Sequence, residues 1–434
     1  MSATVLRGRV LSFRSEPRDI EDEASFSYIE DGALRIEDGL IVSCGEFAEI
    51  ESADAAVIDH RPHILFPGFI DAHAHFPQMQ AIASWGSQLL DWLETYTFPE
   101  EAKFADPAHS RTIARRFLDE LTRHGTTTAA VYCTVHPASV EAFFEEAAVR
   151  NMRMIAGKVM MDRNAPDYLR DTAMSSYDDS KALLEKWHCR GRALYAVTPR
   201  FAITSTPAQM EAAQALVREH LDVYVQTHLS ENHDEIAFTG ELYPDARDYL
   251  DVYEKYDLVG DRSLFGHCIH LSERERQVMA ETRSVAVFCP TSNLFLGSGL
   301  FDEKGLRETG VRRAIATDVG GGTNYSMLRT LDEGYKVLQL QNQKLDPLKS
   351  FYWATLGNAR GLQLEDRIGT LKPGSEADII VLNSHATSAM ATRMETVRSL
   401  QEELFVLETL GDDRAIAETY IAGVAAKRRV ILSE

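Results

Sequence analysis

The middle of the chain alternates short apolar segments with helical ones, and this alternation repeats eight times. Helical patterns fill most of the intervals between the expected strands, for example at 110–123, 139–150, 207–220 and 272–281. Eight strand–helix units in series predict an α/β fold, a (β/α)8 TIM-type barrel. With 434 residues and 44% apolar content, the chain is long and apolar enough for such a core. The expected strands are 64–71, 126–132, 153–160, 193–198, 222–227, 263–268, 284–288 and 314–317.

Both ends of the chain are instead rich in strand patterns. Near the start these are residues 4–13 and 33–44, with a turn signal at Glu37-Asp38-Gly39. Near the end they are residues 376–383 and a hairpin at 419–430 around Gly423. We therefore expect one small β-sandwich domain built from residues 1–64 plus 368–434, and a metal-binding barrel domain over residues 65–367.

Charge and cysteine content exclude several classes of partner. The 45 Lys and Arg residues against 66 Asp and Glu residues give a net charge of −21, which repels polyanions, so we expect no nucleic-acid partner. The five cysteines are scattered and form no C-x-x-C pair, as in cytoplasmic proteins with reduced thiols. We find no signal-peptide pattern and no apolar run of about 18 residues, so we also expect no membrane partner.

Metal-ligating residue types follow several of the expected strands, at the end of a barrel where active sites lie. The first strand leads into Ala72-His73-Ala74-His75. Two histidines two residues apart on an extended segment point to the same side and can reach one cation. His228 follows the fifth strand, His267 closes the sixth and Asp318 follows the eighth. Each alone has an ordinary explanation, such as a helix cap for the aspartate. Together they predict a metal site on one rim.

The same rim carries an acid–base candidate. Glu231 lies three residues after His228, near the expected metal but free to carry protons. A metal with open coordination positions lowers the pKa of a bound water to near neutrality. Glu231 could then shuttle a proton to the substrate while Asp318 orients or deprotonates the water. These residues predict hydrolysis at an sp² carbon without identifying the carbon.

The chain resembles the amidohydrolase superfamily over nearly its whole length. The resemblance rests on PGFIDAHAH at 67–75, the later histidines and aspartate, and GTLKPGSEAD at 369–378. It implies one divalent ion, zinc or alternatively iron, because both accept nitrogen and oxygen ligands. No lysine follows a strand end as the bridging lysines of two-metal relatives do, Lys158 being nearest. The implied ligands are His73, His75, His228 and Asp318, with Glu231 as proton shuttle and His267 beside the bound water.

Within this superfamily, three segments resemble the guanine deaminases. They are FPQ at 76–78 with LLDWLETYTFPE at 89–100, HLSEN at 228–232, and TDVGGGT at 317–323 with YSML at 325–328. The resemblance implies hydrolysis of guanine to xanthine and ammonia by a homodimer. It also implies that the purine is held by Gln78, Arg200 and Phe201, with His228. The Arg200 fork can donate to a carbonyl oxygen, Gln78 offers a donor and an acceptor, and Phe201 can stack on the base.

Other interpretations stay open at this point. A related amidohydrolase could act on cytosine, adenosylhomocysteine or a triazine, and some barrels of this kind are assembly proteins without enzymatic activity. The zinc deaminases that use H-x-E with P-C-x-x-C are a poor match. His233-Asp234-Glu235 fits the first motif, but no P-C-x-x-C exists, so we interpret the fit as chance. The roles of His233 and His270 are open.

Overall fold

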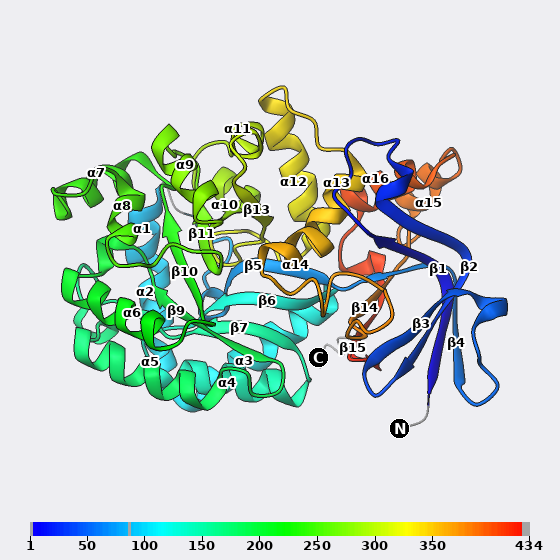
Figure 1. Cartoon of the computed structure of the whole chain (residues 1–434), viewed down its shortest axis with the longest axis horizontal. Helices are drawn as coiled ribbons and strands as arrows, with labels where there is room; N and C mark the ends of the chain where they lie inside the picture. The colour runs from blue at the N-terminus through cyan, green and yellow to red at the C-terminus, as the bar shows by residue number, and fades with distance from the viewer. Residues whose placement is uncertain (1–2, 86–87, 428–434) are drawn as a thin grey trace.

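The computed structural model describes residues 3–85 and 88–427, which form a barrel and a second sheet beside it (Figure 1). The barrel strands are hydrogen-bonded in the order in which they follow one another along the chain, and every neighbouring pair is parallel. The predicted α/β barrel is therefore confirmed. Its strands are β5 (Phe69–His75), β6 (Thr126–Tyr132), β7 (Arg153–Gly157), β9 (Ala193–Pro199), β10 (Tyr224–Leu229), β11 (Ser263–His267), β12 (Val285–Phe288) and β13 (Arg312–Ile315), with β8 (Val159–Met160) also paired to β9.

The barrel closes through the segment that follows β13. The backbone N–H of Asp318 donates to the carbonyl of His73 at 2.9 Å, and the N–H of His75 donates to the carbonyl of Val319 at 2.7 Å. These two bonds join the end of the eighth strand to the first strand. They also bring Asp318 beside both histidines of β5.

Side chains fill the barrel interior at the end away from the pocket. Along β10 the alternation is regular, with Tyr224 in the inner core and Val225 and Leu229 packed outward against the helices. The hydroxyl of Tyr224 donates to the carbonyl of Leu362 at 2.6 Å, which ties the inner core to the segment after α14. Only the carboxyl ends of the strands are left to line a pocket, as expected for this fold.

Helices cover the outside of the barrel, and α3 to α6 form a continuous row along one side of it (Figure 1). They are α3 (Pro107–Arg123), α4 (Pro137–Val149), α5 (Ala173–Trp187), α6 (Pro207–Glu219), α7 (His233–Leu242), α8 (Tyr249–Glu254), α9 (Glu273–Glu281), α10 (Pro290–Phe295), α11 (Glu303–Glu308), α12 (Met327–Leu340), α13 (Pro347–Tyr352) and α14 (Asn358–Gly361).

Shorter helical turns join these elements. α1 (Leu89–Trp92), a π-helical turn η4 (Leu93–Thr97) and α2 (Phe98–Ala102) form one continuous helical segment, and a second π-helical turn η8 (Trp353–Gly357) joins α13 to α14. α15 (Ser388–Met394) and α16 (Leu400–Leu410) lie near the end of the chain. The 3-10 turns are η1 (Glu23–Ser25), η2 (Phe47–Glu49), η3 (Phe76–Gln78), η5 (Lys103–Ala105), η6 (Asp167–Leu169), η7 (Ala202–Thr204) and η9 (Asp413–Ala415).

Strands from both chain ends form one mixed seven-stranded sheet, which confirms that the two ends of the chain build a common β-structure. Its order is β16-β15-β14-β4-β1-β2-β3, with β1 and β4 parallel and the other pairs antiparallel. Alternate residues serve two cores, since Leu6 and Val10 pack within the sheet's own core and Leu11 and Phe13 pack in the main core. The strands are β1 (Thr4–Phe13), β2 (Phe26–Glu37), β3 (Leu40–Glu46), β4 (Ala56–Pro67), β14 (Ile379–Leu382), β15 (Ile416–Ile421) and β16 (Val424–Ala425).

Several expected strands have different limits in the structure. The segment 64–71 is divided at Gly68, with β4 in the terminal sheet and β5 in the barrel. The pattern could not show this because both parts are apolar and contiguous. The segment 153–160 is divided at Lys158, and the fifth strand spans 224–229 rather than 222–227. Residues 428–430 of the expected hairpin lie outside the described residues. The domain limits at 64/65 and 367/368 stay a prediction.

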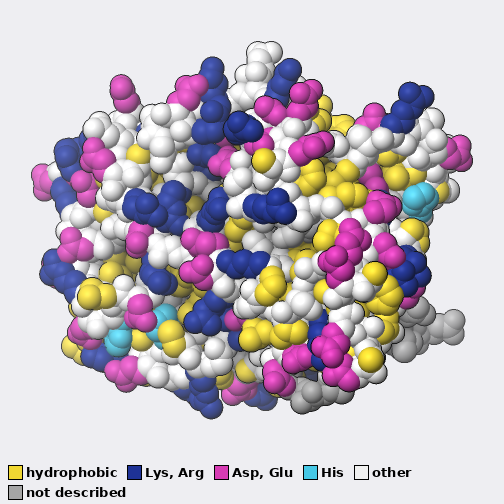
Figure 2. Space-filling model, turned by 45° about the vertical axis from the view of Figure 1, so that its right-hand side comes forward, with side chains coloured by type: hydrophobic (Ala, Val, Ile, Leu, Met, Phe, Trp, Pro, Cys, Tyr) yellow, Lys and Arg dark blue, Asp and Glu magenta, His cyan; other side chains and the backbone are white. Residues whose placement is uncertain are grey.

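The surface mixes charges of both signs. On the face drawn in Figure 2, Lys and Arg side chains lie interspersed with Asp and Glu side chains rather than in one basic field. Such a surface offers no continuous track for a phosphate backbone on that face. Among the described residues, every helix is too short or too polar to cross a membrane.

A buried carboxyl in the helical layer makes stability depend on pH. Glu408 of α16 is fully buried, and Ser350 donates to one of its oxygens at 3.1 Å while the other oxygen lacks a partner among the described residues. Burial raises the pKa of Glu408 to about 8. Between its usual pKa and this one, the folded chain holds a proton that the unfolded chain has lost, so stability falls as pH rises from about 4.5 to about 8.

We expect Glu408→Gln to gain stability relative to the unmodified chain as pH rises, because glutamine never ionises. The difference in free energy of unfolding should grow in favour of the variant by on the order of 1–4 kcal/mol between pH 5 and pH 8. Urea unfolding at pH 5, 6.5 and 8 measures it. Glu395→Gln, at an exposed position, is the control. A difference that does not change with pH would show that Glu408 is ionised in the folded chain.

Candidate active site

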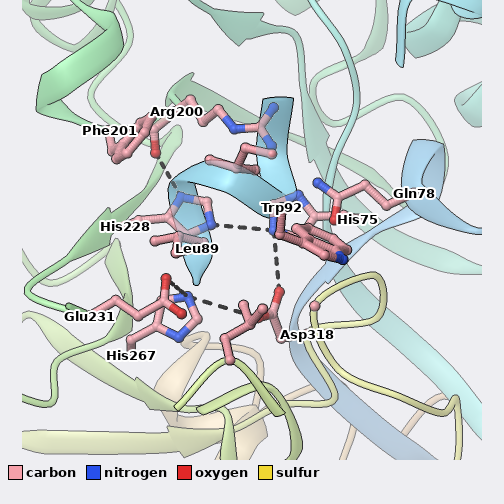
Figure 3. A pocket seen from close by; sticks show the side chains of 13 residues that line it. His75, Gln78, Leu89, Trp92, Arg200, Phe201, His228, Glu231, His267 and Asp318 are labelled. Atoms are coloured by element: carbon pink, nitrogen blue, oxygen red, sulfur yellow. Dashed lines mark hydrogen bonds and ion pairs between the residues drawn. The ribbon is translucent and has the colours of Figure 1, made fainter. Parts of the chain in front are cut away.

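A pocket opens at the carboxyl ends of the barrel strands, and Figure 3 shows the side chains that line it. One wall is polar and comes from β5, β10, β11 and the segment after β13. The other is largely apolar and comes from α1, η4 and the loops after β9 and α10. The lining residues are His75, Gln78, Leu89, Trp92, Leu93, Arg200, Phe201, His228, Glu231, His267, Leu296, Asp318 and Gly321.

Four ligand-type atoms converge in the polar wall. The Nε2 atom of His75 lies 3.1 Å from Nε2 of His73 and 3.3 Å from Nε2 of His228. Oδ1 of Asp318 lies 3.3 Å from Nε2 of His73 and 3.3 Å from Nε2 of His75. His73, His75 and Asp318 are each less than 5% exposed. The predicted cluster is therefore assembled from β5, β10 and the segment after β13.

These four spacings fit neighbouring ligands of one divalent ion. Ligand atoms about 2.0–2.1 Å from a zinc-like cation stand about 3.3 Å from one another. The tautomers fit as well, because Nδ1 of His228 lies 2.7 Å from the carbonyl oxygen of Arg200 and must donate to it. Its Nε2 then carries a lone pair that points into the cluster. Burial lowers the pKa of His75 to about 4, so its imidazole is neutral at pH 7.

Glu231 and His267 stand beside this cluster. Nε2 of His267 lies 3.3 Å from Oε2 of Glu231 and 3.8 Å from Oδ2 of Asp318, between the two carboxyl groups. Asn293 of α10 lies 2.9 Å from Nδ1 of His267 on the other side of the ring. Burial lowers the pKa of His267 to about 3, so this ring is also neutral. It is placed to hydrogen-bond a molecule between Glu231 and Asp318.

The two carboxyl groups of the pocket titrate in opposite directions. Burial, and then the negative charges of Glu235 and Asp318, raise the pKa of Glu231 well above its usual range. Burial alone would raise the pKa of Asp318, but the hydrogen bond and charge of His73 and the hydrogen bond of His75 outweigh it and hold that pKa well below its usual range. The pocket therefore pairs a carboxyl group of raised pKa with one of lowered pKa, an arrangement that suits an acid and a base role.

Gln78, Arg200 and Phe201 lie on the side of the pocket away from Asp318. Gln78 belongs to η3, directly after β5, and Arg200 and Phe201 follow β9. The Phe201 ring stands at 64° to that of His228, with centroids 6.2 Å apart. It also belongs, with Trp92, to a buried apolar cluster, so it serves both the core and the pocket wall.

The structure thus brings together the residues predicted from sequence. Gln78, Arg200, Phe201, His75, His228, Glu231, His267 and Asp318 line the pocket, and His73 completes the cluster beneath it. Lys158 does not join them, because it forms a buried ion pair with Asp171. The H-x-E match at His233 is a helix start, where Asn232 and Glu235 form a capping box. The His233 ring lies against that of His270, with centroids 3.9 Å apart and planes tilted by 31°.

Sequence reasoning missed several residues around the site. Tyr132 closes β6, and its ring stacks on His75 with centroids 4.5 Å apart. Ser298 donates to Oε1 of Glu231 at 2.9 Å. Glu101 accepts hydrogen bonds from Gln78 and Arg200. Tyr132 carried a usable signal, namely its place at the end of an expected strand. A second usable signal was the helical spacing of three pocket residues, which puts them on one face of a helix. They are Leu89, Trp92 and Leu93.

Comparison with known proteins agrees with this geometry. The chain is 50% identical over 406 residues to the guanine deaminase of Escherichia coli (strain K12), covering 93% of this chain and 92% of that protein. The solved E. coli guanine deaminase superposes with a TM-score of 0.95 at 48% identity, covering 97% of this chain and 99% of that one. A guanine deaminase from C. acetobutylicum, solved with guanine in its active site, gives 0.87 at 28% identity, covering 98% and 99%. The amidohydrolase family pattern matches residues 64–426, and the chain belongs to the amidohydrolase family.

Proposed function

We propose that this chain is a guanine deaminase, which hydrolyses guanine to xanthine and ammonia. The observation that carries the proposal is one pocket in which the His and Asp cluster faces Gln78, Arg200 and Phe201. The extensive similarity to the E. coli enzyme supports the same activity. The pocket combines apolar walls with a few placed polar groups, as sites for flat heterocycles do.

The metal ligands in this proposal are His73, His75, His228 and Asp318. Their nitrogen and oxygen atoms suit zinc and also accept iron. A divalent ion held there supplies the positive charge that lets a water molecule lose a proton near pH 7. The buried site supports a single ion, because Lys158 is occupied by Asp171 and is not free to bridge two.

The residues of the pocket divide the proton transfers between them. As the water oxygen adds to C2 of guanine, Asp318 takes one of its protons and Glu231 gives a proton to a ring nitrogen. Glu231 then moves the remaining proton of that oxygen to the leaving amine, and the C2–N bond breaks as C2=O forms. The proton on Asp318 returns to Glu231 and restores the starting state. His267 holds the water by a hydrogen bond between the two carboxyl groups.

The other side of the pocket holds the base. Arg200 donates to the guanine carbonyl, Gln78 bonds its edge, and Phe201 and His228 contact its faces. Guanine is the partner of the site in this proposal. Assembly into a homodimer and a location in the cytoplasm also stay predictions, as does the division into residues 1–64 plus 368–434 and residues 65–367.

The activity itself is testable directly. We expect purified protein to convert guanine to xanthine with release of ammonia and to contain a transition metal, with zinc favoured. Ammonia release across guanine, adenine, cytosine and triazines, with elemental analysis of the same sample, measures both. Activity on cytosine or a triazine without activity on guanine would contradict the proposal, and so would a preparation free of transition metal after purification without chelators.

The shuttle role predicts a specific loss. Glu231→Gln removes the transferable proton but keeps the size of the side chain, so turnover should fall by about 10²–10⁴-fold while bound metal is retained. Steady-state kinetics and metal analysis measure the two quantities. Glu241→Gln, at an exposed position on the following helix α7, should leave both unchanged. Normal turnover in the Glu231 variant would remove this residue from the mechanism.

Removal of the metal should cost both activity and stability. Buried lone pairs that face one another without an ion repel, and an ion that binds only the folded chain stabilises it. We expect a chelator to abolish turnover and lower the melting temperature, and zinc to restore both. Calorimetry with and without chelator measures this shift. An unchanged melting temperature with full turnover after proven metal removal would rule out the role of the ion.

A further inference from the structure

One buried carboxylate joins the two polar groups that face the base. Glu101 belongs to α2 and is fully buried. Its Oε1 accepts from Nε2 of Gln78 at 3.0 Å, and Nη1 of Arg200 donates to both of its oxygens, at 2.9 and 2.7 Å. Glu101 does not itself line the pocket. It can influence a substrate only through Gln78 and Arg200.

The bond to Glu101 fixes which atom Gln78 presents. A free glutamine amide can turn either its oxygen or its nitrogen toward a ligand. A carboxylate only accepts, so Nε2 must face Glu101 and Oε1 is left as the acceptor. Gly320 leaves room for this arrangement, because a β-carbon there would lie 2.2 Å from Oε1 of Gln78. The amide therefore presents an acceptor, which seeks an N–H group.

Glu101 also fixes which atoms Arg200 presents to a ligand, and these atoms are hydrogen-bond donors. Within the described residues its side-chain hydrogen bonds all come from Nη1, and the guanidinium also lies over the Phe98 ring at 5.5 Å. Nε and Nη2 therefore keep donors for a carbonyl or a bare ring nitrogen. The negative charge of Glu101 neutralises the guanidinium, with both side chains under 5% exposed. The recognition edge is thus polar but not charged overall, which suits a neutral base.

We propose that Glu101 is a positioning residue that sets the donor and acceptor pattern of this edge. The pattern selects a ring with a carbonyl oxygen and an N–H over one with an exocyclic amine and a bare ring nitrogen. The inference rests on the proposed function, since it concerns how the same pocket chooses guanine. An amine opposite Arg200 would place donor against donor, and a bare nitrogen opposite Gln78 would place acceptor against acceptor.

The comparison of guanine with 2,6-diaminopurine tests this inference. Both carry the 2-amino leaving group, but the second has an amine in place of the carbonyl at position 6. The unmodified enzyme should prefer guanine by at least about 100-fold in kcat/KM. In Glu101→Gln the neutral amide no longer fixes either partner. KM for guanine should rise by about 10-fold or more with a smaller change in kcat, and the preference should fall by about 10-fold.

Two further variants separate positioning from folding. Glu100→Gln changes the neighbouring carboxylate, which pairs with Lys103 outside the pocket, and should leave KM and the preference unchanged.

Glu101→Asp keeps the negative charge but moves it back by one methylene. Its preference for guanine should lie between those of the unmodified chain and Glu101→Gln. If Glu101→Gln is insoluble, the Asp variant decides, because an unaltered preference there overturns the inference. Metal content is measured for every variant.

The results also distinguish this inference from the proposed function. If the unmodified chain releases no ammonia from guanine, the proposed function fails and the inference fails with it. If it does so and Glu101→Gln keeps the same KM and preference, only the role of Glu101 is overturned. A loss of kcat alone, with KM and preference unchanged, also overturns it, because such a result would place Glu101 in the chemistry instead of recognition.

Discussion

The site depends on the hydrogen bonds that close the barrel between β5 and the residues after β13. Asp71 stands at this seam, fully buried, and accepts from the backbone N–H of Thr317 at 3.0 Å as well as from its hydroxyl. Next to it, the backbone N–H of Asp318 donates to the carbonyl of His73. Because the seam fixes both backbones, it also fixes the imidazoles and the carboxylate they carry. Residues nearly 250 positions apart in the chain therefore meet within one coordination sphere.

The sequence was sufficient to predict which side chains meet there. Parallel strands in a barrel end at one rim, so any residue placed directly after a strand is brought to that rim. His228 and Asp318 could be assigned without knowledge of the strand limits to better than two residues. The spacing of His73 and His75 was informative in the same way, since residues two apart on a strand share a face. The sequence placed residues 64–71 in one strand and missed its division at Gly68, but this error in the strand limits did not affect the reasoning.

Other parts of the site depend on backbone geometry and on long-range contacts that no local pattern encodes. His267 and Asp318 have φ angles of 72° and 48°, in the left-handed region that residues other than glycine rarely adopt. Nothing in their neighbours predicts this turn, which aims both side chains inward. Gly266 is another case, because a β-carbon there would lie 2.6 Å from the His73 ring. The role of Glu101 likewise could not be predicted from its neighbours, because its partners Gln78 and Arg200 lie 23 and 99 positions away in the chain.

The finished pocket shifts the pKa values of its two carboxyl groups in opposite directions before a substrate enters. The histidines around Asp318 lower its pKa, and the charge of Asp318 contributes to the raised pKa of Glu231. Arg200 is paired with the buried carboxylate of Glu101. A water molecule and a neutral purine therefore meet two carboxyl groups with oppositely shifted pKa values and a fixed set of hydrogen-bond donors. Burial raises the pKa of both carboxyl groups, so it is the histidines around Asp318, which outweigh burial there, that separate the chemical roles of the two.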